Sequence, residues 1–392
     1  MKPTSEFFSN IPTTIFAVMS GLAAKHGAIN LGQGFPDTDG PLWIREAAAE
    51  ETISGYNQYP PLMGVQDLRE AVAEDNKRFY GLDIDAASEV MVTSGATEAL
   101  NCCFQGLLND GDEAIIIEPF YDCYEPQIKI AGGIAKFVRL SPPHWRLDEA
   151  ELRAAFSSKT KLIVLNTPLN PAAKVFTREE LEMIAKLLIE FDAYAVCDEV
   201  YEHLLFDGRP HIPLMSLPHM RERCVRIGSA GKTFSLTGWK IGYVTAPAAL
   251  LKPIAAAHQF TTFTTPPNLQ VAIAKGLRAD DRYYAELTAQ MDGGRKILSE
   301  GLGRIGFDVL PCEGTYFLTV DFARIAAKLG FVGSDYDFCV WLTEKAGVTG
   351  IPMSPFYSAS TLPPPQTLMR LCFAKKDNLI HEAIKRLEQA LA

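Results

Sequence analysis

The sequence lacks any apolar run of the roughly 18 residues that a membrane-spanning helix needs, and its first residues contain no apolar segment of the signal-peptide type. It also lacks the acceptor tripeptide Asn-x-Ser/Thr and any Cys-x-x-Cys pair, and the spacings of its eight cysteines match no zinc or haem pattern. We therefore expect reduced, mostly buried thiols in a cytoplasmic protein that makes no membrane contact.

Basic residues are outnumbered by acidic ones, 37 to 47, which gives a formal net charge of −10. A protein that binds nucleic-acid phosphates needs a basic face, so we expect no nucleic-acid partner. A small anionic ligand is compatible with this balance, because a local group of cations can oppose the global charge. With 47% hydrophobic and 21% charged residues, the 392-residue chain has the composition of a globular protein of two or three domains.

Several familiar motifs are absent or stand in the wrong context. Residues 301–306 satisfy Gly-x-Gly-x-x-Gly, but they follow a helical pattern and precede a strand, whereas a dinucleotide site requires the opposite order. Gly-Lys-Thr at 231–233 lacks the first glycine of a P-loop, whose place is taken by Arg226. No His-Glu-x-x-His or Gly-x-Ser-x-Gly occurs, and the histidines are scattered, so we expect no metal and no serine triad.

Short β-branched runs alternate with helical patterns through the middle of the chain. A capping box at Thr177–Glu180, followed by apolar residues at helical spacing, opens one of the predicted helices. This alternation is typical of an α/β protein with a largely parallel sheet that is covered on both faces. The predicted strands are Val90–Thr93, Glu113–Ile117, Ala135–Leu140, Lys161–Leu165, Tyr194–Cys197, Cys224–Ile227 and Gly242–Ala246.

After about residue 280 the pattern changes to a smaller α+β arrangement. Long helices are predicted at Asp281–Gly301 and Asp377–Leu391, and a strand at Leu368–Phe373. The first 40 residues contain one helical stretch, Ile15–His26, which we expect to pack against this second part. The predicted organisation is an N-terminal segment at 1–40, a large domain at 41–285 and a small domain at 286–392.

Four chemically distinctive segments follow predicted strands, where open α/β sheets place their ligands. They are Ser94–Leu100, Asn166–Pro171, Asp198–Tyr201 and Gly228–Lys240. Each has a plain alternative, because the first could be an ordinary helix cap and the others solvated loops. An acid and a lysine at the ends of buried strands nevertheless suggest chemistry, since burial lowers the pKa of a lysine and frees its amine as a nucleophile.

In this order the motifs make the sequence similar to a known family over nearly the whole chain. It resembles the class I aminotransferases of fold type I, which use pyridoxal 5′-phosphate (PLP), and within them the branch of methionine and kynurenine/glutamine aminotransferases. The resemblance implies a mostly parallel seven-stranded sheet in a large domain and a smaller α+β domain. It rests on Asn30–Asp37, Asn57–Pro60, Glu118–Pro126, Asp198–Tyr201, Gly228–Lys240, Gly314–Phe317 and Arg370–Phe373.

The resemblance assigns the catalytic roles residue by residue. Lys232 matches the lysine that forms a Schiff base with PLP and then shuttles a proton between the substrate Cα and the cofactor. Asp198 matches the acid that pairs with the pyridine nitrogen, so that the ring can accept electrons. Asn170 and Tyr201 match the pair that hydrogen-bonds the phenolic oxygen, and Tyr121 matches the aromatic side chain that stacks on the ring.

The phosphate site is implied in the same way. The helix N-terminus at Gly95, Ala96 and Thr97 would present free N–H groups to the phosphate, together with Ser229 and Lys240. The family usually has arginine where Lys240 stands, and lysine supplies the charge without the bidentate fork. Tyr59 matches a residue that reaches the phosphate from the neighbouring subunit, which implies a homodimer.

For the substrate, Arg370 matches the arginine that clamps the α-carboxylate, with Gly34 and Asn170 beside it. Phe16 resembles an aromatic residue that lines the pocket in the kynurenine branch. Dicarboxylate-specific relatives carry a second arginine, and none stands in Gln259–Pro266. We therefore expect an aminotransferase for neutral or aromatic L-amino acids that transfers their amino group to a 2-oxo acid by a ping-pong mechanism.

Other functions stay open at this point. The same scaffold serves N-succinyldiaminopimelate aminotransferases and cysteine-conjugate β-lyases, and a non-enzymatic regulator with this fold is conceivable. In the loop after Asn170, Ala172 and Ala173 stand where glycine is common, which we expect to alter the loop shape and not the chemistry.

Overall fold

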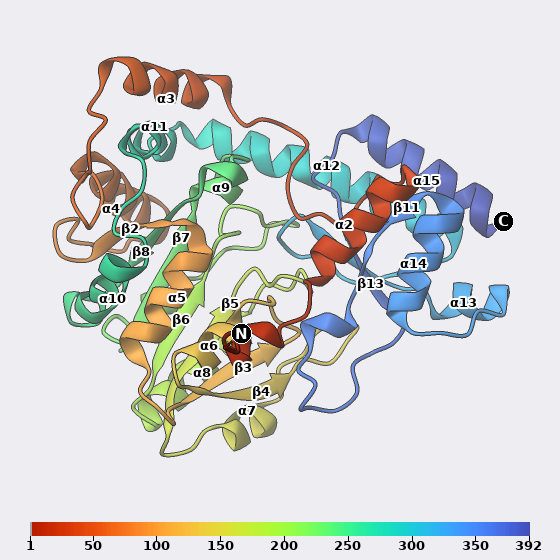
Figure 1. Cartoon of the computed structure of the whole chain (residues 1–392), viewed down its shortest axis with the longest axis horizontal. Coiled ribbons are helices and arrows are strands. Elements are labelled where there is room, and N and C mark those ends of the chain that lie inside the picture. The colour runs from red at the N-terminus through yellow and green to blue at the C-terminus, as the bar shows by residue number, and fades with distance from the viewer. Residues whose placement is uncertain (1) are drawn as a thin grey trace.

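The computed structural model describes residues 2–392 and contains a seven-stranded sheet with helices on both faces (Figure 1). The strand order is β2-β8-β7-β6-β5-β3-β4, and only β8 runs antiparallel to its neighbours. The predicted α/β architecture is thereby confirmed, and every predicted strand of this sheet ends within two residues of its observed bounds. These are β2 Val90–Ser94, β3 Glu113–Glu118, β4 Ile134–Arg139, β5 Thr160–Asn166, β6 Tyr194–Asp198, β7 Cys224–Ser229 and β8 Ile241–Thr245.

Alternate residues of the buried strands face opposite layers of the core. In β3, Ala114 and Ile116 pack with helices α5, α6 and α10, whereas Ile115 and Ile117 pack with the layer that contains α7 and α8. Side chains of a strand alternate between the faces of its sheet, so a strand covered on both sides must be apolar at every position. The helices around the sheet are α3 Leu42–Ser54, α4 Gln66–Tyr80, α5 Gly95–Leu107, α6 Tyr124–Ile130, α7 Glu149–Ala155, α8 Arg178–Glu190, α9 Ala230–Thr233, α10 Ala248–Thr261 and α11 Pro267–Leu277.

A second, antiparallel sheet has the order β12-β13-β10-β9 and lies beside the long helices of the C-terminal part. Helix α2 contacts α14, and β1 pairs with β11, so the N-terminal residues pack against this part of the molecule. The remaining elements are α1 Glu6–Ser9, α2 Ile15–His26, β1 Ile29–Asn30, α12 Asp281–Ile305, β9 Asp308–Val309, β10 Phe317–Asp321, α13 Ala323–Leu329, α14 Asp335–Ala346, β11 Val348–Thr349, β12 Ile351–Pro352, β13 Leu368–Cys372 and α15 Asp377–Leu391.

Two local predictions can be compared directly with the observed elements. The capping box at the start of α8 is present, with the Thr177 hydroxyl accepting from the Glu180 backbone and the Glu180 carboxylate accepting from Thr177. Residues 301–305 belong to α12, and Gly306 caps its C-terminus, so the Gly-x-Gly-x-x-Gly motif is part of a helix end. Among the helices within residues 2–392, none combines the length and the apolar character that spanning a bilayer would require.

Candidate active site

A cavity of about 560 Å³ lies between the carboxyl ends of the parallel strands and the second sheet. Strands β5, β6 and β7 contribute the residues at their ends, α5 contributes its first turn, and α2 and β13 close the opposite side. All the predicted site residues except Tyr59 line it. They are Phe16, Gly34, Gly95, Ala96, Thr97, Tyr121, Asn170, Asp198, Tyr201, Ser229, Lys232, Lys240 and Arg370.

The first turn of α5 approaches β8 so closely that only glycines fit there. Gly95 has a φ of +75°, and a Cβ on it would lie 3.2 Å from Lys240 Nζ. A Cβ on Gly242 would lie 2.6 Å from the carbonyl carbon of Gly95. The backbone N–H groups that start α5 therefore face the cavity next to a lysine ammonium group, which is the chemistry of an anion site.

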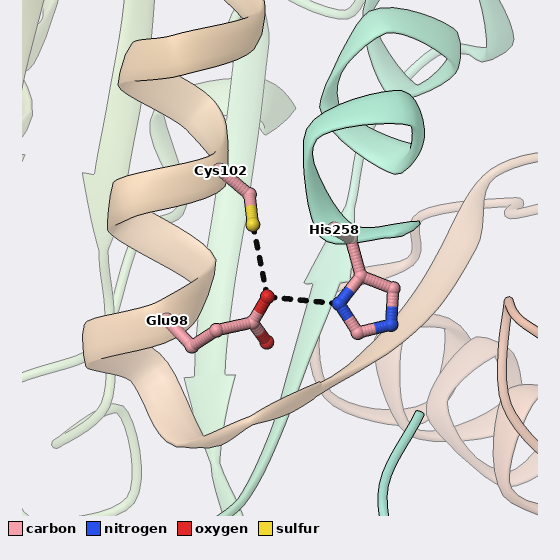
Figure 2. Close-up of side chains that lie close together, drawn as sticks. All are labelled: Glu98, Cys102 and His258. Carbon is pink, nitrogen blue, oxygen red and sulfur yellow. Dashed lines mark hydrogen bonds and ion pairs between the residues drawn. The ribbon is translucent and has the colours of Figure 1, made fainter. Parts of the chain in front are cut away.

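Glu98 connects this turn to neighbouring groups, and Figure 2 shows its contacts with Cys102 and His258. One of its carboxylate oxygens accepts a hydrogen bond from the backbone N–H of Ser94 at 2.8 Å. The other oxygen accepts one from Cys102 Sγ at 2.9 Å and lies 2.8 Å from His258 Nδ1 on α10. Glu98 and His258 were not predicted as site residues, because a helix residue and a histidine 160 positions away give no joint signal in the sequence.

Asp198 ends β6 with one carboxylate oxygen satisfied and one without a partner. Oδ2 accepts a hydrogen bond of 2.6 Å from the Tyr124 hydroxyl, while buried Oδ1 makes none within residues 2–392. Burial raises the pKa of Asp198, and the bond from Tyr124 opposes that rise. A buried carboxylate with a free oxygen in a cavity is suited to bind a cationic N–H donor.

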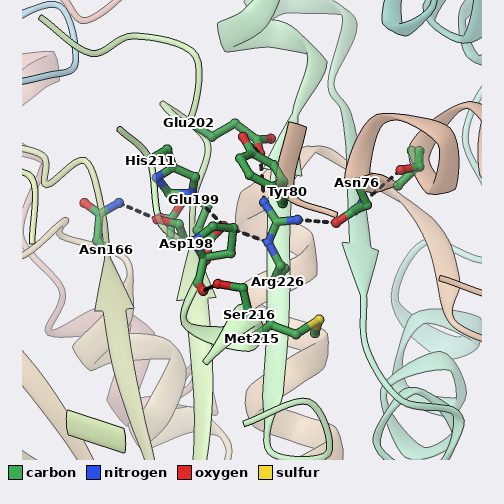
Figure 3. A network of polar contacts seen from close by, with 12 residues as sticks. Asn76, Tyr80, Asn166, Asp198, Glu199, Glu202, His211, Met215, Ser216 and Arg226 are labelled. Atoms are coloured by element: carbon green, nitrogen blue, oxygen red, sulfur yellow. Dashed lines mark hydrogen bonds and ion pairs between the residues drawn. The ribbon is translucent and has the colours of Figure 1, made fainter. Parts of the chain in front are cut away.

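The strand ends around Asp198 are connected by hydrogen bonds from polar side chains (Figure 3). Asn166 Nδ2 donates to the carbonyl of Asp198 at 2.8 Å, and Asn166 Oδ1 accepts from the backbone N–H of Asn170 at 2.8 Å. Behind Asp198, Arg226 donates to Glu199 at 2.7 Å and to Glu202 at 2.8 Å. These bonds fix the loops that carry Asn170 and Asp198 relative to one another.

Lys232 projects from the short helix α9 toward the second sheet. Its Nζ donates to the Tyr316 hydroxyl at 2.9 Å, and that hydroxyl donates to the carbonyl of Gly34 at 2.6 Å. The Nζ also lies 5.6 Å from the centre of the Tyr201 ring. Tyr316 belongs to the Gly314–Phe317 motif but was not predicted as a site residue of its own.

Arg370 is a buried cation that bonds only to neutral oxygens. It is 1% exposed, and it donates to Asn170 Oδ1 at 2.7 Å and to the carbonyl of Gly32 at 3.0 Å. Its Nε has no partner in the described part of the chain, and burial lowers its pKa. The guanidinium lies over the Phe317 ring at 3.9 Å. A buried guanidinium without an acidic partner is set to receive a carboxylate from outside.

Tyr59 and the loop after Asn170 are two further predicted features of the site. Tyr59 is 79% exposed, lies outside the cavity and packs its ring against Phe263 at 5.6 Å. Ala173 adopts a φ of +57°, the left-handed region that favours glycine, and its carbonyl accepts hydrogen bonds from Glu313 and Gly314. This loop turns without glycine and still places Asn170 in the cavity.

Comparison with known proteins gives a uniform result. The model of the family "Aminotransferase class I and II" matches residues 26–387. The methionine aminotransferase of Escherichia coli (strain K12) is 44% identical over 377 residues, covering 96% of both chains. Human kynurenine–oxoglutarate transaminase 1 is 38% identical over 94% of this chain and 93% of its own.

Among solved structures, the N-succinyldiaminopimelate aminotransferase of Mycobacterium tuberculosis superposes with a TM-score of 0.95 at 40% identity, covering the whole of both chains. The matched span covers both sheets and every residue that lines the cavity from Gln33 onward. The chain therefore belongs to the class I and II aminotransferase family and is a PLP-dependent aminotransferase of fold type I.

Proposed function

We propose that this aminotransferase accepts neutral and aromatic L-amino acids, methionine among them, as amino donors to a 2-oxo acid. The observation that carries the proposal concerns Arg370, which lies among Phe16, Tyr121 and Phe317. It is the only arginine among the described residues that line the cavity. One guanidinium can bind one carboxylate, and the apolar lining disfavours a second charge because of the cost of desolvation. The named methionine and kynurenine aminotransferases among the relatives support this substrate class.

The cavity fits PLP, because buried polar groups without partners and backbone N–H groups face into it at matching positions. The N–H groups of Gly95, Ala96 and Thr97, with Ser229 and Lys240, would hold the phosphate. The free Oδ1 of Asp198 would accept a hydrogen bond from the protonated pyridine nitrogen, and the Tyr121 ring would stack on the cofactor. Asn170 and Tyr201 would bind its phenolic oxygen. When bound, PLP supplies an electron sink for the carbon that loses its proton.

Lys232 supplies the amine that holds the cofactor and carries the proton. Its Nζ is the group that would hold PLP, and as a free amine it would move the proton from the substrate Cα to C4′ of the cofactor. Proton transfer requires an amine that is neutral part of the time. The Tyr316 hydroxyl, which accepts from Nζ at 2.9 Å and donates to Gly34, would position this amine.

Arg370 would orient the substrate. Its position is fixed by Asn170 and Gly32, so the remaining donors of the guanidinium keep a constant direction toward the cavity. A carboxylate bound there places the amino acid Cα in one orientation, which lowers the entropic cost of the reaction. Gly34 borders the same position, where a Cβ would lie 2.7 Å from the Phe317 ring. Donor and acceptor would use this cavity in turn, as ping-pong kinetics require.

The half-reaction with a panel of donors tests the substrate class. Holoenzyme is mixed with methionine, phenylalanine, glutamine, kynurenine, aspartate or N-succinyldiaminopimelate, and the loss of cofactor absorbance is followed by stopped flow. We expect methionine and the aromatic donors to react fastest. A preference for aspartate would overturn the proposal, and a preference for N-succinyldiaminopimelate would establish the activity named for the M. tuberculosis relative. Ammonia release from a cysteine conjugate without a 2-oxo acid would reveal a β-lyase.

We further propose a homodimer in which Tyr59 of each subunit reaches the phosphate site of the other. Tyr59 is exposed, and it lies beside exposed apolar side chains of the 52–59 and 260–268 segments. The most exposed of these are Ile53 at 84%, Tyr56 at 69% and Phe260 at 86%. The two segments adjoin, because the Asn268 side chain donates to the Thr52 hydroxyl at 2.8 Å. Exposed apolar side chains on adjoining segments are typical of a subunit interface.

The proposed organisation keeps a PLP-binding domain at 41–285 and a small domain at 286–392, with 1–40 packed on the latter. The strands of the two sheets support it, because one sheet spans residues 90–245 and the other 308–372. The proposed boundary lies inside α12, so a continuous helix would join the domains. We also propose a cytoplasmic location, which is supported by eight free cysteine thiols, all within residues 2–392. Cell fractionation with a tagged chain tests the location.

A further inference from the structure

A second cavity, of about 660 Å³, lies apart from the active site, between the C-terminal end of α4, the 202–211 segment and α12. None of its lining residues belongs to the active-site cavity. Its walls combine aromatic rings with carboxylates and imidazoles, which is the lining of a site for a cation and not for an anion. The residues that matter here are Phe79, Tyr80, Glu202, His203, His211 and Tyr284.

Three ligand-bearing side chains converge beside this cavity. Asp75 of α4, Glu202 and His203 each offer one atom, and these atoms lie within 4.8 Å of one another. Asp75 and Glu202 are each 4% exposed and His203 is 9% exposed. Asp75 Oδ1 and His203 Nε2 are buried and have no hydrogen-bond partner within residues 2–392. Buried polar atoms without partners are rare and costly, so two of them in one cluster indicate a missing binding partner.

Asp75 differs from the neighbouring buried carboxylates because it lacks a cationic partner. The guanidinium of Arg226 bonds to Glu199 and Glu202 (Figure 3), and the Tyr80 hydroxyl also donates to Glu202. Asp75 forms no ion pair within residues 2–392, and the nearby Arg78 is paired with Asp281 at the surface. A divalent cation in the cluster would pair with the Asp75 carboxylate.

We propose that Asp75, Glu202 and His203 form a binding site for one divalent transition-metal cation of the Zn²⁺ type, with water from the cavity completing its coordination. One imidazole nitrogen and two carboxylate oxygens are a ligand set that Zn²⁺ accepts in proteins. The buried Nε2 of His203 has no hydrogen-bond partner within residues 2–392, so it can present a lone pair to a metal. The ring is held between Phe79 at 4.8 Å and Tyr284 at 4.5 Å, which limits its orientation.

Two other clusters of possible metal ligands are less suited to bind a cation. Glu199, Glu202 and His211 also lie within 4.8 Å, and Glu199 Oε1 and His211 Nδ1 have no partner within residues 2–392. Both carboxylates of that cluster are already paired with Arg226, whereas Asp75 forms no ion pair in the described residues. Glu98, Cys102 and His258 form a closed set of hydrogen bonds on one oxygen, and burial raises the pKa of the Cys102 thiol, which disfavours the thiolate that a metal needs. The second of these clusters provides a matched control.

The test measures Zn²⁺ binding by the holoenzyme after removal of metals with a chelator. Equilibrium dialysis at pH 7.5 followed by metal analysis gives the stoichiometry and affinity, and thermal melting gives the stabilisation by bound metal. We expect one Zn²⁺ per chain and a higher melting temperature with the metal. Asp75→Asn and His203→Gln should weaken this binding at least tenfold and abolish the thermal shift, whereas His258→Gln should leave both unchanged.

The Asp75→Asn variant keeps the test valid if His203→Gln folds poorly, because it is isosteric and alters an oxygen that has no partner. Wild-type holoenzyme that takes up no more Zn²⁺ than either variant would overturn the proposal. Loss of the bound ion in His258→Gln alone would also overturn it, since the metal would then occupy the Glu98 cluster. Neither outcome bears on aminotransferase activity, so this test is independent of the proposed substrate class.

Discussion

At the scale of single residues, the burial of the Arg370 guanidinium without an acidic partner costs free energy. An incoming substrate carboxylate can recover this cost. Arg370→Lys keeps the charge and removes the planar fork. We expect kcat/KM with methionine to fall by about 100-fold, which corresponds to about 2.7 kcal/mol of lost transition-state binding. Steady-state kinetics measure it. Arg209→Lys, an exposed arginine paired with Glu313, is the control, and a change no larger in Arg370→Lys than in this control would contradict the assignment.

Tyr124 supports Asp198 through a single hydrogen bond, and the substitution Tyr124→Phe removes only that bond. We expect the dissociation constant of PLP to rise by about tenfold or more, since a hydrogen bond to a charged group contributes about 1.5–3 kcal/mol. The bond lowers the pKa of Asp198, so its loss raises that pKa and the carboxylate becomes protonated at a higher pH. The defect should therefore grow as the pH falls.

Cofactor fluorescence titrated across pH measures this effect. Tyr243→Phe is the matched control, because the Tyr243 hydroxyl is also buried but has no hydrogen-bond partner in residues 2–392. Equal affinity for PLP in the two variants at every pH would show that Tyr124 does not act through Asp198.

Residue identities at the site could be predicted where the chain itself carries the signal. A lysine and an acid at strand ends stand out in the sequence, and the structure places Asp198, Lys232, Asn170 and Arg370 around one cavity. Tyr124 and Tyr316 could not be predicted as their partners, because a tyrosine that hydrogen-bonds a distant side chain resembles any core aromatic. Their roles depend on contacts across 74 and 84 positions of the chain.

At the scale of elements, the first turn of α5 depends on glycine. Gly95→Ala would force a side chain into the left-handed region, at about 1–2 kcal/mol, and bring a methyl group 3.2 Å from Lys240 Nζ. We expect weaker PLP binding with the fold retained, measured by cofactor titration and by thermal melting of the apoenzyme. Gly303→Ala, inside α12 with no atom within 4 Å of the added Cβ, should not weaken PLP binding. A similar PLP affinity in both variants would refute the role of this turn.

Strand positions were predictable because buried parallel strands are continuous apolar runs, and the capping box of α8 is a purely local signal. The backbone of Lys240 was not predictable in the same way. Its φ of +56° places the ammonium next to the start of α5, and it arises from the junction with β8 and not from a preference of lysine. Ala173 shows the same principle, since tertiary contacts hold it where glycine is usual.

At the scale of the whole molecule, the exposed apolar patch around Tyr59 predicts association. Phe260→Glu places a charge at its most exposed position and should shift the protein toward monomers and weaken PLP retention. Light scattering after size exclusion measures the mass. Val332→Glu, at a residue that is 96% exposed in the C-terminal part, should leave the assembly intact. A wild-type mass and cofactor content in Phe260→Glu would exclude this face as the interface.

The α/β class and the strand positions can be predicted from the sequence, because periodicity and caps are local properties. The roles of the main site residues follow from the resemblance of the motifs to the aminotransferase family. Four features depend on the tertiary structure: the strand order with β8 antiparallel, the partners of Asp198 and Lys232, the close approach of Lys240 to α5, and the burial of Arg370 without an ion pair in the described residues. The tertiary structure also decided that Asp75 meets Glu202 and His203. These features depend on which distant segments pack together, and packing is set by the shape and polarity of the whole core.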